Sequence, residues 1–158
     1  MGYVEKHLIP NETVLYVTRL SWTVYLRAYL VLLVGIGLLA WAAYGGGVLD
    51  VTNPLLAAGG VVLLIGFILF LIALIRRSAS EFAVTDKRVI IKVGLFSRRS
   101  VEILLTKVEA VTVDQTLAGR IFGYGSITII GTGGTKEPFD LISDPLEFRR
   151  QSQIAATS

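Results

Sequence analysis

The sequence predicts a membrane-embedded helical hairpin joined to a small, mainly β domain that is closed by a C-terminal helix. Three observations predict this fold class. A single charged residue, Asp50, occurs between Ala28 and Ile75; apolar and polar residues alternate after Ser80; and a proline-initiated helix pattern follows Asp144. Of the 158 residues, 53% are hydrophobic and 17% are charged, whereas soluble domains average about 25% charged residues. This composition excludes an ordinary soluble enzyme and a disordered chain.

The N-terminal segment, residues 1–23, precedes the first apolar stretch and mixes charged with apolar residues. Within it, the alternation from Thr13 to Leu20 predicts a strand. Both ends of the chain are expected on one side of the membrane, so we expect this strand to pack on or pair with the sheet of the later domain.

Two apolar stretches, residues 24–44 and 55–75, form the predicted hairpin. Each is about 31 Å long as a helix, which matches the hydrocarbon core of a bilayer. The short link ends in Asn53-Pro54, a pattern typical of a helix start. Of the 15 Lys and Arg residues, 14 lie outside residues 24–75, Arg27 lies one turn from the start of the first stretch, and none lies in the link. The positive-inside rule therefore predicts a multi-pass protein of the inner (plasma) membrane with both termini cytoplasmic.

Small residues recur every seventh position in both apolar stretches, and seven residues are close to two helical turns. They are Ala28, Gly35 and Ala42 in the first stretch and Gly59, Gly66 and Ala73 in the second. Small residues let membrane helices approach closely, so we expect the two stripes to face each other or a second copy of the chain. Neither stretch carries a charged or amide side chain at its centre, which argues against a channel or transporter.

Residues 80–158 predict a cytoplasmic domain of six or seven short antiparallel strands, a partly open barrel that a C-terminal helix plugs at one end. The expected strands are 81–85, 88–93, 95–104 (one strand or a bent pair), 108–115, 126–130 and 138–142. A helical turn is expected over 116–122. The closing helix begins after Asp144, where an N-cap, Pro145 and Glu147 form a capping pattern.

Several of these segments, in this order, resemble the bacterial PH-like (pleckstrin-homology) membrane-flanked domain family of the two-helix hairpin type. They are Leu8–Leu15, Phe82–Ile90, Gly94–Ser100, the run Gly119-Arg-Ile-Phe-Gly-Tyr-Gly125 and Asp144–Phe148. The resemblance implies an α+β, mainly β, PH-like domain: a bent antiparallel sheet of about seven strands capped by a C-terminal helix. It implies no common reaction, so it bears on the fold more than on the function.

The residues that carry most enzyme chemistry are missing or isolated. The chain has no cysteine and one histidine, His7, and its acidic residues occur singly along alternating strands, which does not suggest paired catalytic carboxylates or a metal site. The segment 131–135 is rich in glycine but lacks the Gly-Lys-Ser/Thr ending of a phosphate-binding loop, so it is interpreted as a turn. We therefore expect no enzyme activity, cofactor or metal.

Basic residues near the second span and the first strand pair form a candidate site for anionic lipid, because each cation near a membrane surface contributes about 1 kcal/mol. They are Arg76, Arg77, Lys87, Arg88, Arg98 and Arg99. The alternative is that these cations only set the membrane topology and solvate a hairpin tip. Nucleic acid is not expected as a partner, because basic and aromatic residues do not interleave.

The most apolar turn outside the predicted strands is the candidate contact patch for a partner: Leu117, Ile121, Phe122 and Tyr124. Burial against the sheet is the alternative for these side chains. The sequence therefore favours a non-enzymatic scaffold that binds itself or another membrane protein, through a free strand edge or a groove beside the C-terminal helix. Lipid binding or sensing, and a role as an accessory subunit of a membrane enzyme or transporter, remain as alternatives.

Overall fold

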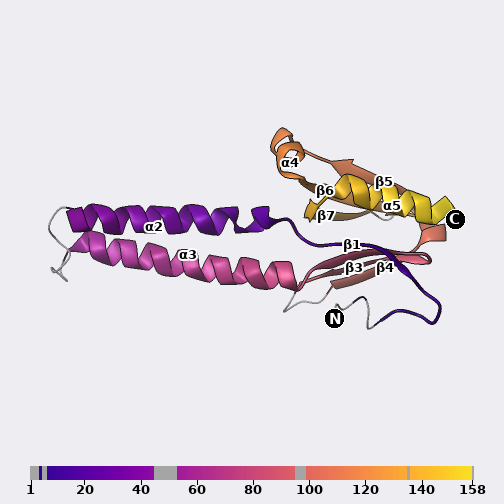
Figure 1. Ribbon diagram of the computed structural model, residues 1–158, viewed down its shortest axis with the longest axis horizontal. Helices are drawn as coiled ribbons and strands as arrows, with labels where there is room; N and C mark the ends of the chain where they lie inside the picture. Colours follow the sequence, from indigo (N-terminus) through magenta and orange to yellow (C-terminus); the bar gives the residue numbers. More distant parts are fainter. Residues whose placement is uncertain (1–3, 5–6, 45–52, 95–98, 135, 158) are drawn as a thin grey trace. The chain divides into compact units, whose positions relative to one another are not determined.

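The computed structural model describes residues 4, 7–44, 53–94, 99–134 and 136–157. The chain divides into two compact units (Figure 1). One is the helical hairpin, residues 24–75, and the other, here called the sheet domain, is built from the segments on both sides of the hairpin. The two units are described separately.

The hairpin consists of α2 (Leu26–Tyr44), which continues from the 3-10 turn η1 (Trp22–Tyr25), and α3 (Pro54–Ser78). Both helices are long and apolar enough to cross a membrane. The Asn53 side chain accepts a hydrogen bond from the Leu55 N–H over 3.0 Å, so Asn53 caps α3 as predicted. The helix α3 ends at Ser78, three residues beyond the expected end at Ile75. Its last turn contains Arg76 and Arg77, whose positive charges suit the negative end of the helix dipole.

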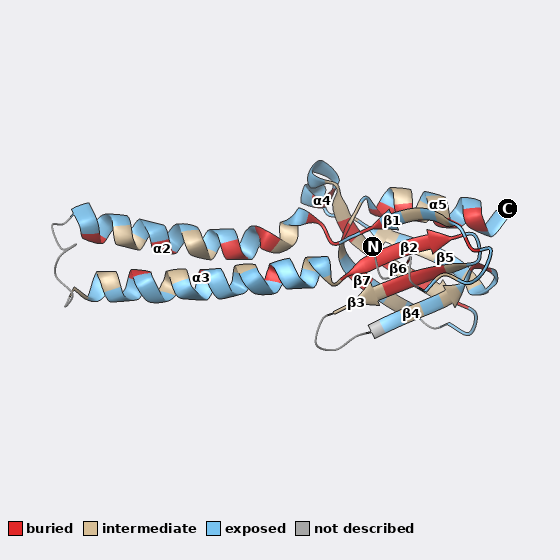
Figure 2. Ribbon diagram, turned by 60° about the horizontal axis from the view of Figure 1, so that its bottom comes forward, coloured by how far each residue is buried: buried red, intermediate tan, exposed pale blue. Residues whose placement is uncertain are grey.

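The small residues of the two stripes are the buried residues of the two helices (Figure 2). Each helical glycine of the stripes faces a leucine of the other helix: Gly35 faces Leu63, Gly59 faces Leu39 and Gly66 faces Leu32. The three pairs share one antiparallel register. The steps from residue 32 to 35 to 39 in α2 match the steps from residue 66 to 63 to 59 in α3. Large and small residues therefore alternate along the contact, and the backbones approach closely at each glycine.

The sheet domain has seven antiparallel strands in two sheets. The first sheet contains β1 (Val14–Thr18), β2 (Glu81–Thr85), β3 (Arg88–Val93) and β4 (Arg99–Leu104), in that order. The second contains β5 (Val108–Asp114), β6 (Tyr124–Gly131) and β7 (Lys136–Ser143). Short helices η2 (Leu105–Lys107) and α4 (Leu117–Phe122) and the C-terminal helix α5 (Pro145–Thr157) complete the unit. The strand expected over Thr13–Leu20 is β1, which pairs with β2.

The core of this unit lies between the sheets and under α5. The ring of Phe82 in β2 packs edge to face on the ring of Phe139 in β7, with the centroids 5.8 Å apart. Phe148 of α5 is fully buried and packs edge to face on Tyr16 of β1. Figure 2 shows β2 as the most buried strand. Its inner face points to this core and its outer face is covered by the N-terminal segment, where Val4 packs with Ala83 and Ile90.

One corner between the two sheets is closed. Leu20, just beyond β1, pairs with Ile142 of β7; the Ser21 N–H donates to the Leu141 carbonyl over 2.7 Å, and the Ser143 N–H donates to the Arg19 carbonyl over 3.0 Å. At the opposite corner, β4 and β5 follow each other along the chain through η2 but belong to different sheets. The seven strands therefore form a partly open barrel.

Candidate functional site: surfaces of the sheet domain

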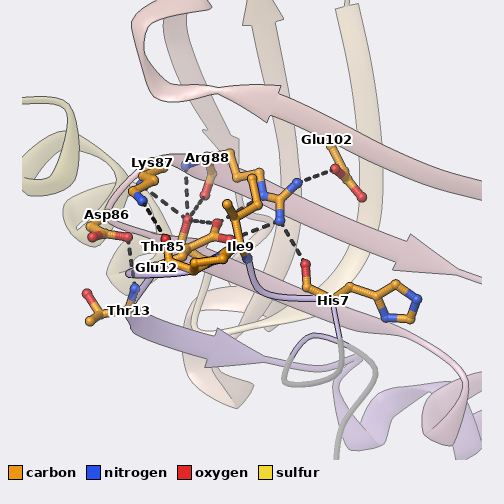
Figure 3. Close-up of polar contacts among 10 residues, drawn as sticks. His7, Ile9, Glu12, Thr13, Thr85, Asp86, Lys87, Arg88 and Glu102 are labelled. Carbon is orange, nitrogen blue, oxygen red and sulfur yellow. Dashed lines mark hydrogen bonds and ion pairs between the residues drawn. The ribbon is translucent and has the colours of Figure 1, made fainter.

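An ion-pair cluster ties the N-terminal segment to the first sheet (Figure 3). Arg88, which begins β3, donates from Nε and from Nη2 to the two carboxylate oxygens of Glu12, each over 2.9 Å. Its Nη1 lies 2.6 Å from Glu102 of β4, and Nη2 also donates to the His7 carbonyl over 2.9 Å. The Glu12 side chain is fully buried, and 11% of the Arg88 side chain is exposed. This paired, bidentate geometry gives strong charge-assisted hydrogen bonds.

Neighbouring polar groups complete the surroundings of Glu12. The Thr85 hydroxyl donates to its carboxylate over 2.8 Å, and the Ile9 N–H donates over 2.7 Å. Burial opposes ionisation of this carboxyl group, but the hydrogen bonds from Arg88, Ile9 and Thr85 and the guanidinium charge lower the pKa of Glu12 below its usual value of 4.5. Glu12 is therefore ionised at neutral pH, and the cluster holds the segment in place.

The cations predicted to bind lipid do not gather on one surface. Arg76 and Arg77 end α3, just before β2 begins. Lys87 and Arg88 follow the other end of β2, about 15 Å away at 3.3 Å per strand residue. Arg88 is also engaged by two carboxylates, so a lipid phosphate would have to compete with both of them.

Of the two remaining cations of that set, the structure places Arg99. Arg99 begins β4 opposite Val93, and the adjacent Lys92 is opposite Glu81, the first residue of β2. The Arg77 Nε donates to the Leu20 carbonyl over 3.1 Å. Arg98 lies outside the described residues. The structure therefore divides the predicted lipid-binding cations into two groups. In the group at the end of β2, Arg88 is already paired with Glu12 and Glu102.

The helix α4 is fixed by caps at both ends. The Thr116 side chain accepts a hydrogen bond from the Gly119 N–H over 3.1 Å, and Gly123 ends the helix in the left-handed conformation, with φ of 68°. A Cβ on Gly119 would lie 2.5 Å from the Tyr124 carbonyl oxygen. Glycine is therefore required at two positions of the run 119–125. Gly123 adopts the left-handed conformation that ends the helix, and Gly119 lies close to the backbone of Tyr124.

The side chains of α4 point mainly to solvent. Leu117 and Ile121, one turn apart, are 80% and 77% exposed, and Phe122 is half exposed. Tyr124, in β6, is partly buried. The Phe122 ring packs edge to face on Trp22 with centroids 5.7 Å apart. Of the four residues in the predicted contact patch, three are therefore exposed. One of these three, Phe122, contacts Trp22, and the sequence does not predict this contact.

A groove of about 450 Å³ lies beside α5, between Tyr16 of β1, Arg120 of α4 and Glu147 of α5. Burial, followed by the charge of the Asp144 carboxylate, raises the pKa of Tyr16, so the phenol is neutral at physiological pH. The Glu147 carboxylate accepts hydrogen bonds from Arg150 and Gln151 over 2.8 and 2.7 Å. The groove is therefore lined by two carboxylates, Asp144 and Glu147, of which Glu147 already accepts two hydrogen bonds.

The free strand edges flank the open corner of the barrel. In the described part of the chain, β4 pairs with β3 and β5 pairs with β6, and no strand lies on their other sides. Unpaired backbone N–H and C=O groups along such an edge accept an additional strand. The charges are distributed differently along the two edges. The strand β4 begins with Arg99 and has Glu102 in its interior, whereas Glu109 and Asp114 of β5 leave an uncharged stretch, Ala-Val-Thr-Val, at residues 110–113.

The family of the chain is shown by its sequence. The sequence profile of the family described as bacterial PH domain matches residues 23–156, which include the hairpin and most of the sheet domain. The chain belongs to the bacterial PH domain family. No characterised protein and no solved structure gave a significant match.

PH domains are typically non-catalytic. Within the described ranges of this PH domain, no three His, Asp or Glu side chains gather in a way that would hold a metal ion. The polar cluster around Glu12 and Arg88 joins two parts of the fold. The other surfaces described above are the strand edges, the groove beside α5 and the exposed α4.

Proposed function

We propose that this chain is a non-enzymatic membrane protein of the inner membrane, with both termini cytoplasmic, whose PH domain is an interaction module. The free edge of β5 carries this proposal, because it offers backbone groups to an extended segment of a partner or of a second copy. The hairpin supports the membrane location: its helices carry large apolar side chains on their exposed faces, such as Leu33 and Leu64.

The β5 edge is favoured over the others by charge and by pairing. Natural sheets protect their edges with charged side chains and proline. Such residues occur in β4, which carries Arg99 and Glu102, and in β7, which carries Lys136, Asp140 and Pro138 among others. The β1 strand is joined to β7 just beyond its end, through the bridge between Leu20 and Ile142. The charged residues of β5, Glu109 and Asp114, lie near its two ends. Residues 110–113 between them carry no charge or proline, and three of these four residues are β-branched, as suits strand pairing.

A lysine on the β5 edge is expected to disrupt the assembly without unfolding the domain. Thr112 is exposed and lies opposite Thr128 of the central strand β6, so Thr112→Lys adds one charge to the edge. Thr128→Lys is the matched control, because it adds the same charge to the paired residue of a strand that has no free edge.

The measurement is the mass of the complex after gentle solubilisation of cells that express the chain at native level. For the wild type and for Thr128→Lys we expect a discrete assembly larger than the 17.2 kDa chain. Thr112→Lys should shift the chain to the monomer. A monomeric wild type, or an assembly unchanged by Thr112→Lys, would contradict the proposed role of β5. A mass that includes another protein would identify the PH domain as an adaptor.

A further inference from the structure

The exposed face of α4 carries apolar side chains that the described residues of the sheet domain leave largely uncovered. Leu117 and Ile121 stand on the same side of the helix because they are four residues apart, and both are more than three-quarters exposed. Both caps of α4 are formed within the chain, so the helix presents these side chains without refolding. A compact apolar patch of this kind marks a contact with protein or with lipid.

The contact between Phe122 and Trp22 indicates which of these it is. Trp22 is the first residue of the candidate span Trp22–Tyr44. This span is about 34 Å long at 1.5 Å per residue, slightly longer than the hydrocarbon core, so its end residues lie at the level of the lipid headgroups. Tryptophan is enriched at this level. The Phe122 ring, 5.7 Å from the Trp22 ring, is therefore held close to the same depth.

The composition of α4 fits that depth. Its exposed side chains are leucine, isoleucine and phenylalanine, with Arg120 beside them. Segments that lie in the membrane interface combine such apolar residues with a cationic residue, which reaches the phosphates while the apolar side chains enter the acyl boundary. A protein partner would not require this set to adjoin the start of a membrane span.

We propose that α4 is a second membrane contact of the chain, with Leu117, Ile121 and Phe122 inserted at the headgroup–acyl boundary of the bilayer that holds the hairpin. The occupant of this patch is thus lipid and not the protein partner that the sequence suggested. The proposal rests on the proposed membrane location of the hairpin. Together with the two covalent links to the hairpin, this contact would restrict rotation of the PH domain on the membrane and fix the direction in which β5 faces.

Environment-sensitive labels on single cysteines test the proposal in the full chain, which has no cysteine of its own. The protein is reconstituted into phosphatidylcholine–phosphatidylglycerol vesicles with or without a nitroxide on the upper acyl chain. The label is placed at Ile121→Cys, at Leu33→Cys on the exposed face of α2, or at Ala156→Cys on the exposed side of α5. Iodide serves as the aqueous quencher.

We expect nitroxide lipid to quench the label at Ile121 and at Leu33 but not at Ala156, and iodide to quench Ala156 alone. An Ile121 label that iodide reaches and lipid does not quench would overturn the α4 contact, while quenching at Leu33 would keep the membrane location. An Ile121 label that neither quencher reaches would also overturn it, in favour of a protein cover. Lipid quenching at none of the positions would reject the membrane location itself. Leu117→Cys repeats the test one turn away.

Discussion

Replacing Gly66 with leucine is expected to separate α2 from α3 and to destabilise the hairpin by about 2–3 kcal/mol, the upper range for overpacked contacts. A Cβ at position 66 would already lie 2.9 Å from the Leu32 Cδ2 and 3.1 Å from the Leu32 backbone nitrogen. Rotation of the Leu32 side chain would relieve the first contact but not the second. The helices must therefore move apart, and the packing that alternates large and small residues is lost along the contact.

The chain offers matched controls for this substitution. A Cβ at Gly37 or at Gly60 would meet nothing within 4 Å, so Gly37→Leu and Gly60→Leu add the same side chain on open faces of the same two helices. Separation of the helices is followed in an SDS titration by energy transfer between labels on cysteines introduced at Leu33 and Leu64. Gly66→Leu should lower the midpoint and the controls should not. Equal midpoints for all three would show that the close approach at Gly66 does not stabilise the hairpin.

Replacing Glu12 with alanine is expected to destabilise the sheet domain by about 3 kcal/mol, because it leaves the guanidinium of Arg88 in a largely buried site without its bidentate partner. The N-terminal segment should detach from the outer face of β2 and β3, which it covers through Val4. Hydrogen exchange of the β2–β3 amides in the full chain measures this effect. Glu102→Ala is the control, since Glu102 contacts the same guanidinium but its side chain is 42% exposed, and exposed pairs contribute up to about 1 kcal/mol.

The same cluster should make the stability of this segment depend on pH. The pKa of Glu12 is lowered in the folded protein, so the unfolded chain binds the proton more readily. The stabilisation is therefore complete above about pH 4.5, the usual pKa of the group, and is lost as the pH falls through the lower folded value. Glu12→Gln should remove this part of the acid dependence of β2–β3 exchange. An unchanged acid profile in Glu12→Gln would show that another group is responsible.

Local patterns predicted the elements of the fold well, because they depend on neighbours in the sequence. The stretch between Ala28 and Ile75, in which Asp50 is the one charged residue, predicts two long apolar helices. The Asn53-Pro54 pair marks the start of α3, and the alternation from Glu81 to Val93 predicts β2 and β3 with the bounds observed. The seven-residue spacing selected the residues that the hairpin buries.

Contacts between distant segments were not predictable in the same way. Glu12 and Arg88 are 76 residues apart, and neither residue has a local feature that identifies the other as its partner. The sequence alone therefore places Arg88 among the candidate lipid-binding cations, whereas the structure shows it paired with Glu12 and Glu102. The contact of Phe122 with Trp22 had no sequence signal either. The leucines opposite Gly35, Gly59 and Gly66 follow from the antiparallel register of the two helices.

The two proposals assign different surfaces of the PH domain to different partners. The edge of β5 would bind an extended segment of protein, and α4 would bind the lipid interface near the start of the candidate span. Both require the hairpin to cross the membrane, with the sheet domain on one side and the link between the helices on the other.

Labelling of single cysteines in intact cells tests this requirement most directly. A membrane-impermeant thiol reagent is added from outside to cells that express Val48→Cys, in the link between the helices, or Ala156→Cys, in α5. We predict that Val48→Cys is labelled in intact cells and that Ala156→Cys is labelled only after lysis. Labelling of Ala156→Cys in intact cells, or protection of Val48→Cys until lysis, would contradict a hairpin that spans the membrane with both termini in the cytoplasm.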